Sequence, residues 1–121
     1  MTALPDTITY ADLDRQLPDT ACARRTIGNN TTAERDLDTI IVRLHGHPVI
    51  VLSERAVQVR DCGWWTVTTK DRLNRALRPL GARVYSKRGA RTLRRPDGTE
   101  EPWLGGETVY LSETETAGAA R

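Results

Sequence analysis

The sequence predicts an α+β fold in one domain: an antiparallel β-meander of three strands, one central helix, then a further β-hairpin and a last strand. Two observations predict it. Apolar and polar residues alternate with the period of a strand between residues 39 and 60, across short connections. The apolar spacing then becomes helical over residues 70–80 and returns to alternation toward residue 111. A chain of 121 residues has the length of one domain.

The meander is predicted by three consecutive apolar patterns. Ile40, Val42 and Leu44 alternate with their neighbours and indicate the first strand. Residues 49–52 form a continuous apolar run, which is typical of a strand buried on both faces or nearly so. The pattern of residues 56–60 alternates again, and the short connections favour antiparallel neighbours.

Apolar residues recur at helical spacing over residues 70–80. Thr69 is expected to cap the amino end of this helix, and Pro79 and Gly81 are expected to end it. Because one helix cannot cover both faces of such a sheet, we expect the protein to be a homo-oligomer. The later strands are expected at residues 82–87, 90–95 and 107–111.

The ends of the chain have weaker patterns. Residues 1–38 are expected to form an N-terminal extension, with a short helix that is capped by Thr9 and ends before Pro18. The turn-rich stretch that follows has no apolar period and predicts no strand. Residues 39–111 are expected to be the single α+β domain, and residues 112–121 a disordered tail.

Several classes of protein are disfavoured. No apolar run has the roughly 20 residues that a membrane span needs, and the amino terminus lacks a signal peptide, so we expect a cytoplasmic protein without membrane partners. Cys22 and Cys62 fit no metal or redox spacing. His45 and His47 could ligate a metal as an H-x-H pair, or serve a Cys62 nucleophile, but no further ligand or signature supports either. We therefore expect no enzyme activity, no metal and no cofactor.

Charge is distributed unevenly although the net charge is only +2. Residues 70–95 hold ten basic residues against one acid, Asp71, whereas residues 96–121 hold six acids and one arginine. A block of this kind attracts phosphate-bearing partners, although it could also be a solvated face that the acidic tail neutralises.

The segment from Gly63 to Asn74 leads two tryptophans and three threonines into the predicted helix. The amino end of a helix has unpaired N–H groups and a partial positive charge, which favour an anion. Trp64 or Trp65 could stack on a base, while the other packs in the core. The alternative to a ligand-binding site is that Thr69 only caps the helix.

Three segments resemble motifs of small tailed-phage and prophage proteins over about residues 24–88. They are the R-x-I-x-N-N-T segment at residues 25–31, the R-L-H segment at residues 43–45, and the G-W-x-T-x-T-T-K-x-R-L-N segment. Compared with that pattern, Cys62 stands in place of a glycine, and aromatic residues are absent after Thr31 and in the second hairpin. The resemblance implies a phage protein, active in the host cytoplasm when it is phage-encoded.

Proteins of this size and chemistry are similar to phage nucleotide-signal sponges, which sequester cyclic nucleotide or ADP-ribose-type messengers of host defence. The resemblance therefore implies a non-enzymatic protein that binds a phosphate-bearing small molecule. The alternatives are a nucleic-acid-binding protein that uses the basic surface of residues 70–95, and a protein inhibitor of a host nuclease or CRISPR complex. The expected ligand-binding residues are Arg25, Asn29, Asn30, Trp64, Thr68, Thr69, Lys70, Arg72 and Asn74.

Overall fold

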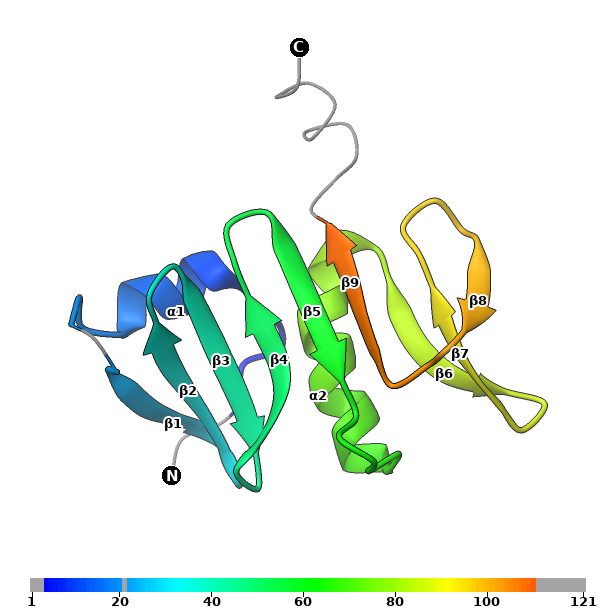
Figure 1. The fold of residues 1–121 in the computed structure, drawn as a ribbon, viewed down its shortest axis with the longest axis horizontal. Coiled ribbons are helices and arrows are strands. Elements are labelled where there is room, and N and C mark those ends of the chain that lie inside the picture. The colour runs from blue at the N-terminus through cyan, green and yellow to red at the C-terminus, as the bar shows by residue number, and fades with distance from the viewer. Residues whose placement is uncertain (1–3, 21, 111–121) are drawn as a thin grey trace, which may run out of the picture.

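The computed structural model describes residues 4–20 and 22–110, which form two antiparallel sheets and two α-helices (Figure 1). A six-stranded sheet has the order β1-β2-β3-β4-β5-β9, and a three-stranded sheet has the order β6-β7-β8. The elements are α1 (Tyr10–Gln16), β1 (Arg24–Gly28), β2 (Thr31–Asp36), β3 (Thr39–Leu44), β4 (His47–Leu52), β5 (Ala56–Arg60), α2 (Val67–Leu77), the 3-10 helix η1 (Arg78–Leu80), β6 (Arg83–Lys87), β7 (Ala90–Arg94), β8 (Glu100–Pro102) and β9 (Gly106–Tyr110).

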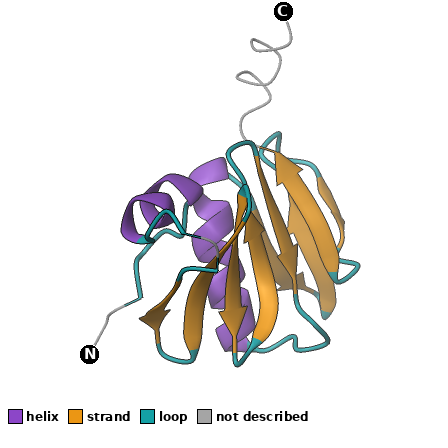
Figure 2. Cartoon of the chain, turned by 60° about the vertical axis from the view of Figure 1, so that its left-hand side comes forward, coloured by secondary structure: helices purple, strands orange, loops and turns teal. Residues whose placement is uncertain are grey.

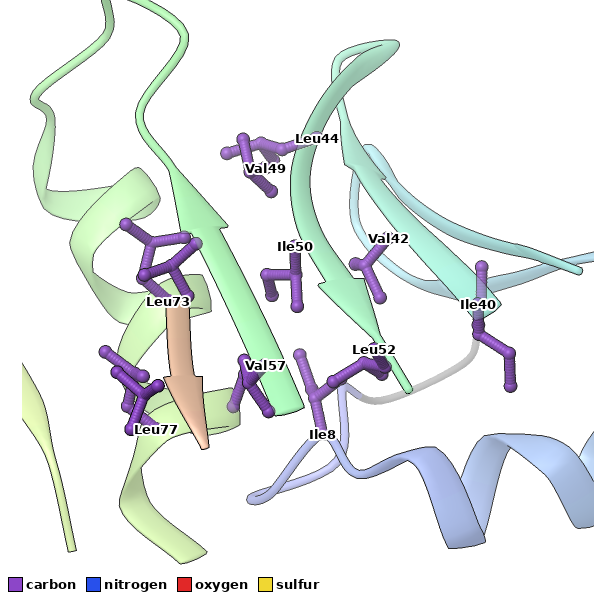
Figure 3. Close-up of a cluster of buried hydrophobic side chains, with 14 of the residues drawn as sticks. Ile8, Ile40, Val42, Leu44, Val49, Ile50, Leu52, Val57, Leu73 and Leu77 are labelled. Atoms are coloured by element: carbon purple, nitrogen blue, oxygen red, sulfur yellow. The ribbon is translucent and has the colours of Figure 1, made fainter. Parts of the chain in front are cut away.

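Both helices lie on one face of the six-stranded sheet, as the turned view makes clear (Figure 2). The core forms between that face and the helices. Leu73 and Leu77 of α2 and Ile8, which precedes α1, are fully buried against apolar residues of β3, β4 and β5 (Figure 3). Removing this apolar area from water is the main favourable term that holds the helices to the sheet.

The predicted fold class is confirmed. The meander corresponds to β3, β4 and β5, the central helix to α2, and the later hairpin and strand to β6, β7 and β9. The short helix before Pro18 is also confirmed, because Thr9 caps α1 and its side chain accepts a hydrogen bond from Asp12 N. The strand β8 was not predicted.

The absence of strands before residue 39 was a wrong expectation, because β1 and β2 extend the main sheet there. The inward residues of β2 are Thr31, Ala33 and Arg35, so its buried face has no apolar period. Buried polar groups are tolerated when they are hydrogen-bonded. The Arg35 guanidinium donates to the carbonyls of Pro18, Asp14 and Leu17 and to the Asp14 carboxylate.

The prediction that Thr69 caps the central helix was also wrong. The cap is Thr66, which has extended backbone angles and whose Oγ1 accepts from Thr69 N at 3.1 Å. Thr69 lies in the first helical turn and is buried. The segment between β5 and Thr66 has no regular secondary structure. At the other end, Pro79 turns the expected last turn into η1.

The expected disordered tail, residues 112–121, lies outside the described residues. Within residues 4–20 and 22–110, neither helix has the length and hydropathy needed to cross a membrane.

Candidate functional site

A cleft of about 550 Å³ opens beside the amino end of α2. Its walls come from three places: the turn between β3 and β4, the loop between β5 and α2, and the first turn of α2. The lining residues are Leu44, His45, His47, Val49, Asp61, Trp64, Thr66, Thr68 and Thr69.

The loop between β5 and α2 is held by one buried carboxylate. Asp61 Oδ2 accepts a 2.6 Å hydrogen bond from Trp103 Nε1, and Oδ1 accepts from Gly63 N at 2.9 Å. Arg91 Nη1 lies 3.6 Å from Oδ2. The backbone carbonyl of Asp61 accepts a hydrogen bond from Trp64 N, and its N–H donates to Gly105 O. Because Asp61 is 4% exposed, these bonds form in a largely dry environment and fix the position of the loop.

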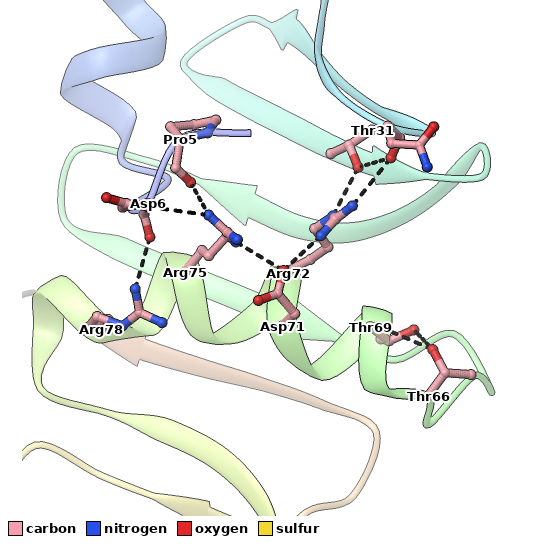
Figure 4. A network of polar contacts seen from close by, with 10 residues as sticks. Pro5, Asp6, Thr31, Thr66, Thr69, Asp71, Arg72, Arg75 and Arg78 are labelled. Atoms are coloured by element: carbon pink, nitrogen blue, oxygen red, sulfur yellow. Dashed lines mark hydrogen bonds and ion pairs between the residues drawn. The ribbon is translucent and has the colours of Figure 1, made fainter. Parts of the chain in front are cut away.

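The first turn of α2 lies beside the cleft and holds hydrogen-bond donors. Thr66 Oγ1 satisfies Thr69 N, and Thr66 O accepts from Lys70 N. In the part of the chain that the structure describes, no acceptor reaches the amides of Val67 and Thr68, as is usual for the first residues of a helix. The Thr68 side chain is exposed and lines the cleft, whereas the Thr69 hydroxyl bonds to that of Thr66 (Figure 4).

Two aromatic rings stand at the mouth of the cleft. The Trp64 indole is 58% exposed, and its ring lies 6.0 Å from that of His47, with 34° between the planes. Trp65 turns the other way: it lies between Lys70 and Arg91, contacts Trp103 and donates to Ser86 Oγ. The exposed ring available for stacking on a ligand is therefore Trp64.

The three segments that carry the phage resemblance meet at this end of the molecule, the lower edge of Figure 1. The β1–β2 turn joins the β3–β4 turn through a 2.8 Å bond from His45 N to Asn30 O. The same turn joins α2, because Arg72 Nε donates to Thr31 Oγ1 and Nη2 donates to Asn29 O. Two of the three segments therefore line the cleft, and the third, residues 25–31, is hydrogen-bonded to both of them.

The expected ligand-binding residues do not form a single group. Trp64, Thr68 and Thr69 line the cleft, and Asn29 and Asn30 lie in the turn next to it. Arg25 is exposed on β1.

The remaining three belong to other contacts. Arg72 is only 12% exposed and already binds Thr31, Asn29 and Asp71 (Figure 4). The Asn74 amide holds the edge of β6 by bonding to both Val84 N and Val84 O. Lys70 and Asn74 line a separate groove on the other side of α2.

Asp71 anchors two arginines of α2, and this predicts a pH dependence. Burial raises its pKa, but the guanidinium groups of Arg75 and Arg72 outweigh burial and hold the pKa below the ordinary value of 3.8. A lowered folded-state pKa stabilises the protein above the unfolded value, and the stabilisation is lost as pH falls through the folded value. Replacing Asp71 by asparagine should therefore lower the free energy of unfolding at pH 7 by less than about 1 kcal/mol, because solvent screens this partly exposed carboxylate.

The difference between this variant and the parent protein should disappear in urea titrations well below pH 3.8. Asp38→Asn is the matched control, since Asp38 is exposed in the β2–β3 turn and has no ion pair among the described residues. An equal effect of both changes at pH 7 would refute the role of Asp71.

Among residues 4–20 and 22–110, no group of three or more histidines, cysteines and acids is placed to hold a metal ion. Cys62 lies in the loop between β5 and α2, and its Sγ is 3.5 Å from Pro48 O. Burial raises the pKa of the Cys62 thiol above 9.0, which keeps it protonated at neutral pH.

Sequence reasoning missed two polar residues of the cleft, Asp61 and Thr66, as well as the apolar Leu44 and Val49, and it misjudged two histidines. No pattern in the sequence pointed to Asp61, because its neighbouring residues do not indicate that a carboxylate at a strand end turns inward and binds a distant tryptophan. His45 and His47 were recognised only as an H-x-H pair. The structure places them opposite the Trp-Thr segment as walls of the cleft.

In a comparison with protein families, the family described as Kyanoviridae Gp96 protein matches residues 19–110. That range includes the whole cleft and excludes α1. No curated protein and no solved structure matches the chain.

Proposed function

Because the chain belongs to the Kyanoviridae Gp96 family of phage proteins, we propose that it is a phage protein that binds a phosphate-bearing nucleotide in the α2 cleft without converting it. Its role is that of a sponge, which lowers the free concentration of a host-defence messenger of the cyclic nucleotide or ADP-ribose type. The observation that carries the proposal is that two of the three phage-type segments line one cleft and the third is hydrogen-bonded to both.

The chemistry of the cleft suits the parts of a nucleotide. The free amides at the start of α2 and the Thr68 hydroxyl are donors for a phosphate, and the helix dipole adds to the attraction. Trp64 and His47 offer flat rings for a base. The walls formed by Leu44 and Val49 suit the apolar surface of a nucleoside.

Binding without conversion agrees with the groups at hand. The buried carboxylate of Asp61 is occupied by Trp103 and Gly63, and the Cys62 thiol faces a carbonyl. A sponge needs only affinity, since each bound molecule is removed from the host signal.

Replacing Trp64 by alanine should weaken nucleotide binding about 5- to 150-fold, the range that loss of one base–aromatic stack produces. The measurement is a thermal-shift screen of cyclic nucleotides and ADP-ribose derivatives, followed by titration calorimetry of the one that stabilises the parent protein. A ligand at 100 times its Kd adds about 2.7 kcal/mol of stability, which a thermal shift detects readily.

Leu104→Ala is the matched control, because Leu104 is also a large exposed apolar residue but does not line the cleft. It should bind the nucleotide as the parent protein does. The proposal fails if no nucleotide in the screen shifts the melting temperature, or if Trp64→Ala binds with unchanged affinity. Chromatography of the released ligand must recover it intact, since a converted nucleotide would contradict the sponge role.

A further inference from the structure

A second concave surface, the basic groove, lies on the opposite side of α2 and has a volume of about 770 Å³. One wall is a stripe of α2 that continues into η1, residues 67, 70, 71, 74 and 78, which share one helical face. The other wall is the free edge of β6, followed by the β7–β8 turn. The Asn74 side chain connects the two walls, because its amide group is hydrogen-bonded to the backbone N–H and carbonyl of Val84.

Cations that have no carboxylate partner line this groove. Lys70, Arg83 and Arg94 form no ion pair within the described ranges, residues 4–20 and 22–110. The acid of the groove, Asp71, is occupied by Arg72 and Arg75 at 2.7 and 2.9 Å.

The other two cations of the groove are partly engaged. Arg95 pairs with Glu101 at 2.7 Å, whereas Arg78 donates to the backbone carbonyl of Asp6. Glu100 lies opposite Arg94 in the register of β7 and β8, but its carboxylate binds Lys87 Nζ at 2.7 Å. The groove therefore carries an excess of positive charge that its own acids do not neutralise.

The register of the hairpin supplies a second, independent observation. Arg83 on β6 stands directly opposite Arg94 on β7. Residues directly opposite in an antiparallel pair project from the same face, and like charges in that position destabilise the sheet. Arg83 turns its guanidinium onto the Tyr85 ring, 4.5 Å from the centroid, which leaves its charge unneutralised. An anion between the two arginines would remove this repulsion.

We propose that the basic groove binds the sugar-phosphate backbone of a single-stranded nucleic acid. From Lys70 to Arg78 the helix rises roughly 12 Å, at 1.5 Å per residue, so the cations are spread over a distance that one phosphate does not span. A nucleic-acid strand carries one phosphate per nucleotide, so several successive phosphates can lie along a row of cations of this length. A positively charged groove that follows a backbone is the usual means of binding a single strand without sequence preference.

The groove is separate from the nucleotide cleft, and its occupation is tested separately. The probe is a fluorescein-labelled oligothymidine of about 20 nucleotides, and fluorescence anisotropy is measured over a series of salt concentrations. Each phosphate that a cation contacts contributes about −0.7 to the slope of log K against log salt for a single strand, so three contacts predict a slope near −2.

Arg94→Gln should weaken binding of the oligothymidine severalfold at low salt and make the slope shallower by about 0.7. Because the change removes the repulsion with Arg83, its melting temperature should equal or exceed that of the parent protein. This combination separates a lost contact from a damaged fold.

Arg88→Asn is the matched control, since it removes the same charge from the β6–β7 turn outside the groove, and asparagine tolerates the positive φ of 53° at that position. It should keep the slope of the parent protein. Three results would overturn the proposal: no oligothymidine binding at low salt, equal losses in Arg94→Gln and Arg88→Asn, or displacement of the probe by an equal phosphate concentration of tripolyphosphate, which would indicate a site for small anions. Each of these results leaves the nucleotide screen and its Trp64 variant unaffected.

Discussion

Replacing Leu73 by alanine is expected to lower the free energy of unfolding by about 3 kcal/mol, within the range of 2–5 kcal/mol seen for buried leucines. Leu73 is 0% exposed and points from the middle of α2 into the core (Figure 3). Its loss removes apolar contacts with the sheet and leaves a cavity that the close-packed surroundings cannot fully close. Urea denaturation followed by circular dichroism measures the effect, with the slope m unchanged if the transition stays two-state.

Val67→Ala is the matched control on the same helix. Val67 is 80% exposed, so its truncation creates no cavity and should change stability by no more than about 0.5 kcal/mol. If Leu73→Ala were as mild as this control, α2 would not be docked on the sheet. The walls of both the cleft and the basic groove would then have no fixed position, because α2 contributes to each.

Replacing Asp61 by alanine is the second large effect. The change leaves the buried Trp103 Nε1–H without its acceptor, which costs about 1–3 kcal/mol, and it also removes the part-buried bond from Gly63 N, which is a smaller loss. We expect a loss of about 3 kcal/mol in total. The tryptophan emission should shift to longer wavelength, because Trp103, now 6% exposed, gains contact with water.

A double-mutant cycle with Trp103→Phe isolates the bond between these two residues. In the Trp103→Phe variant the indole donor is already gone, so Asp61→Ala should cost less there than in the parent protein by about 1 kcal/mol or more. Strict additivity of the two changes would show that the carboxylate and the indole do not interact.

The first turn of α2 connects the two proposals. Its residues project in different directions at helical spacing, so Thr68 and Thr69 line the cleft while Val67 and Lys70 line the basic groove. The sequence motif that joins Trp64 to Asn74 therefore contributes to two surfaces. From the sequence alone, we had expected this motif to form one binding site.

The contacts of Arg72 show why the binding site could not be predicted in full from the sequence. An arginine beside a helix amino end is a good phosphate ligand when its guanidinium is free. Here the β1–β2 turn folds back and supplies two acceptors, and Asp71 supplies a third. Whether an arginine is free depends on contacts from residues some 40 positions earlier, and local spacing carries no information about them.

Local patterns in the sequence were enough to predict the α+β class, the meander, the central helix and the uneven distribution of charge. These features follow from periodicity and composition over a few residues. That β2 is a strand became evident from the three-dimensional contacts, since Arg35 finds its acceptors in the segment before β1. The tertiary structure also placed β9 beside β5 and turned Asp61 inward to Trp103. Partners distant in the chain satisfy these buried polar groups, and only folding brings such partners together.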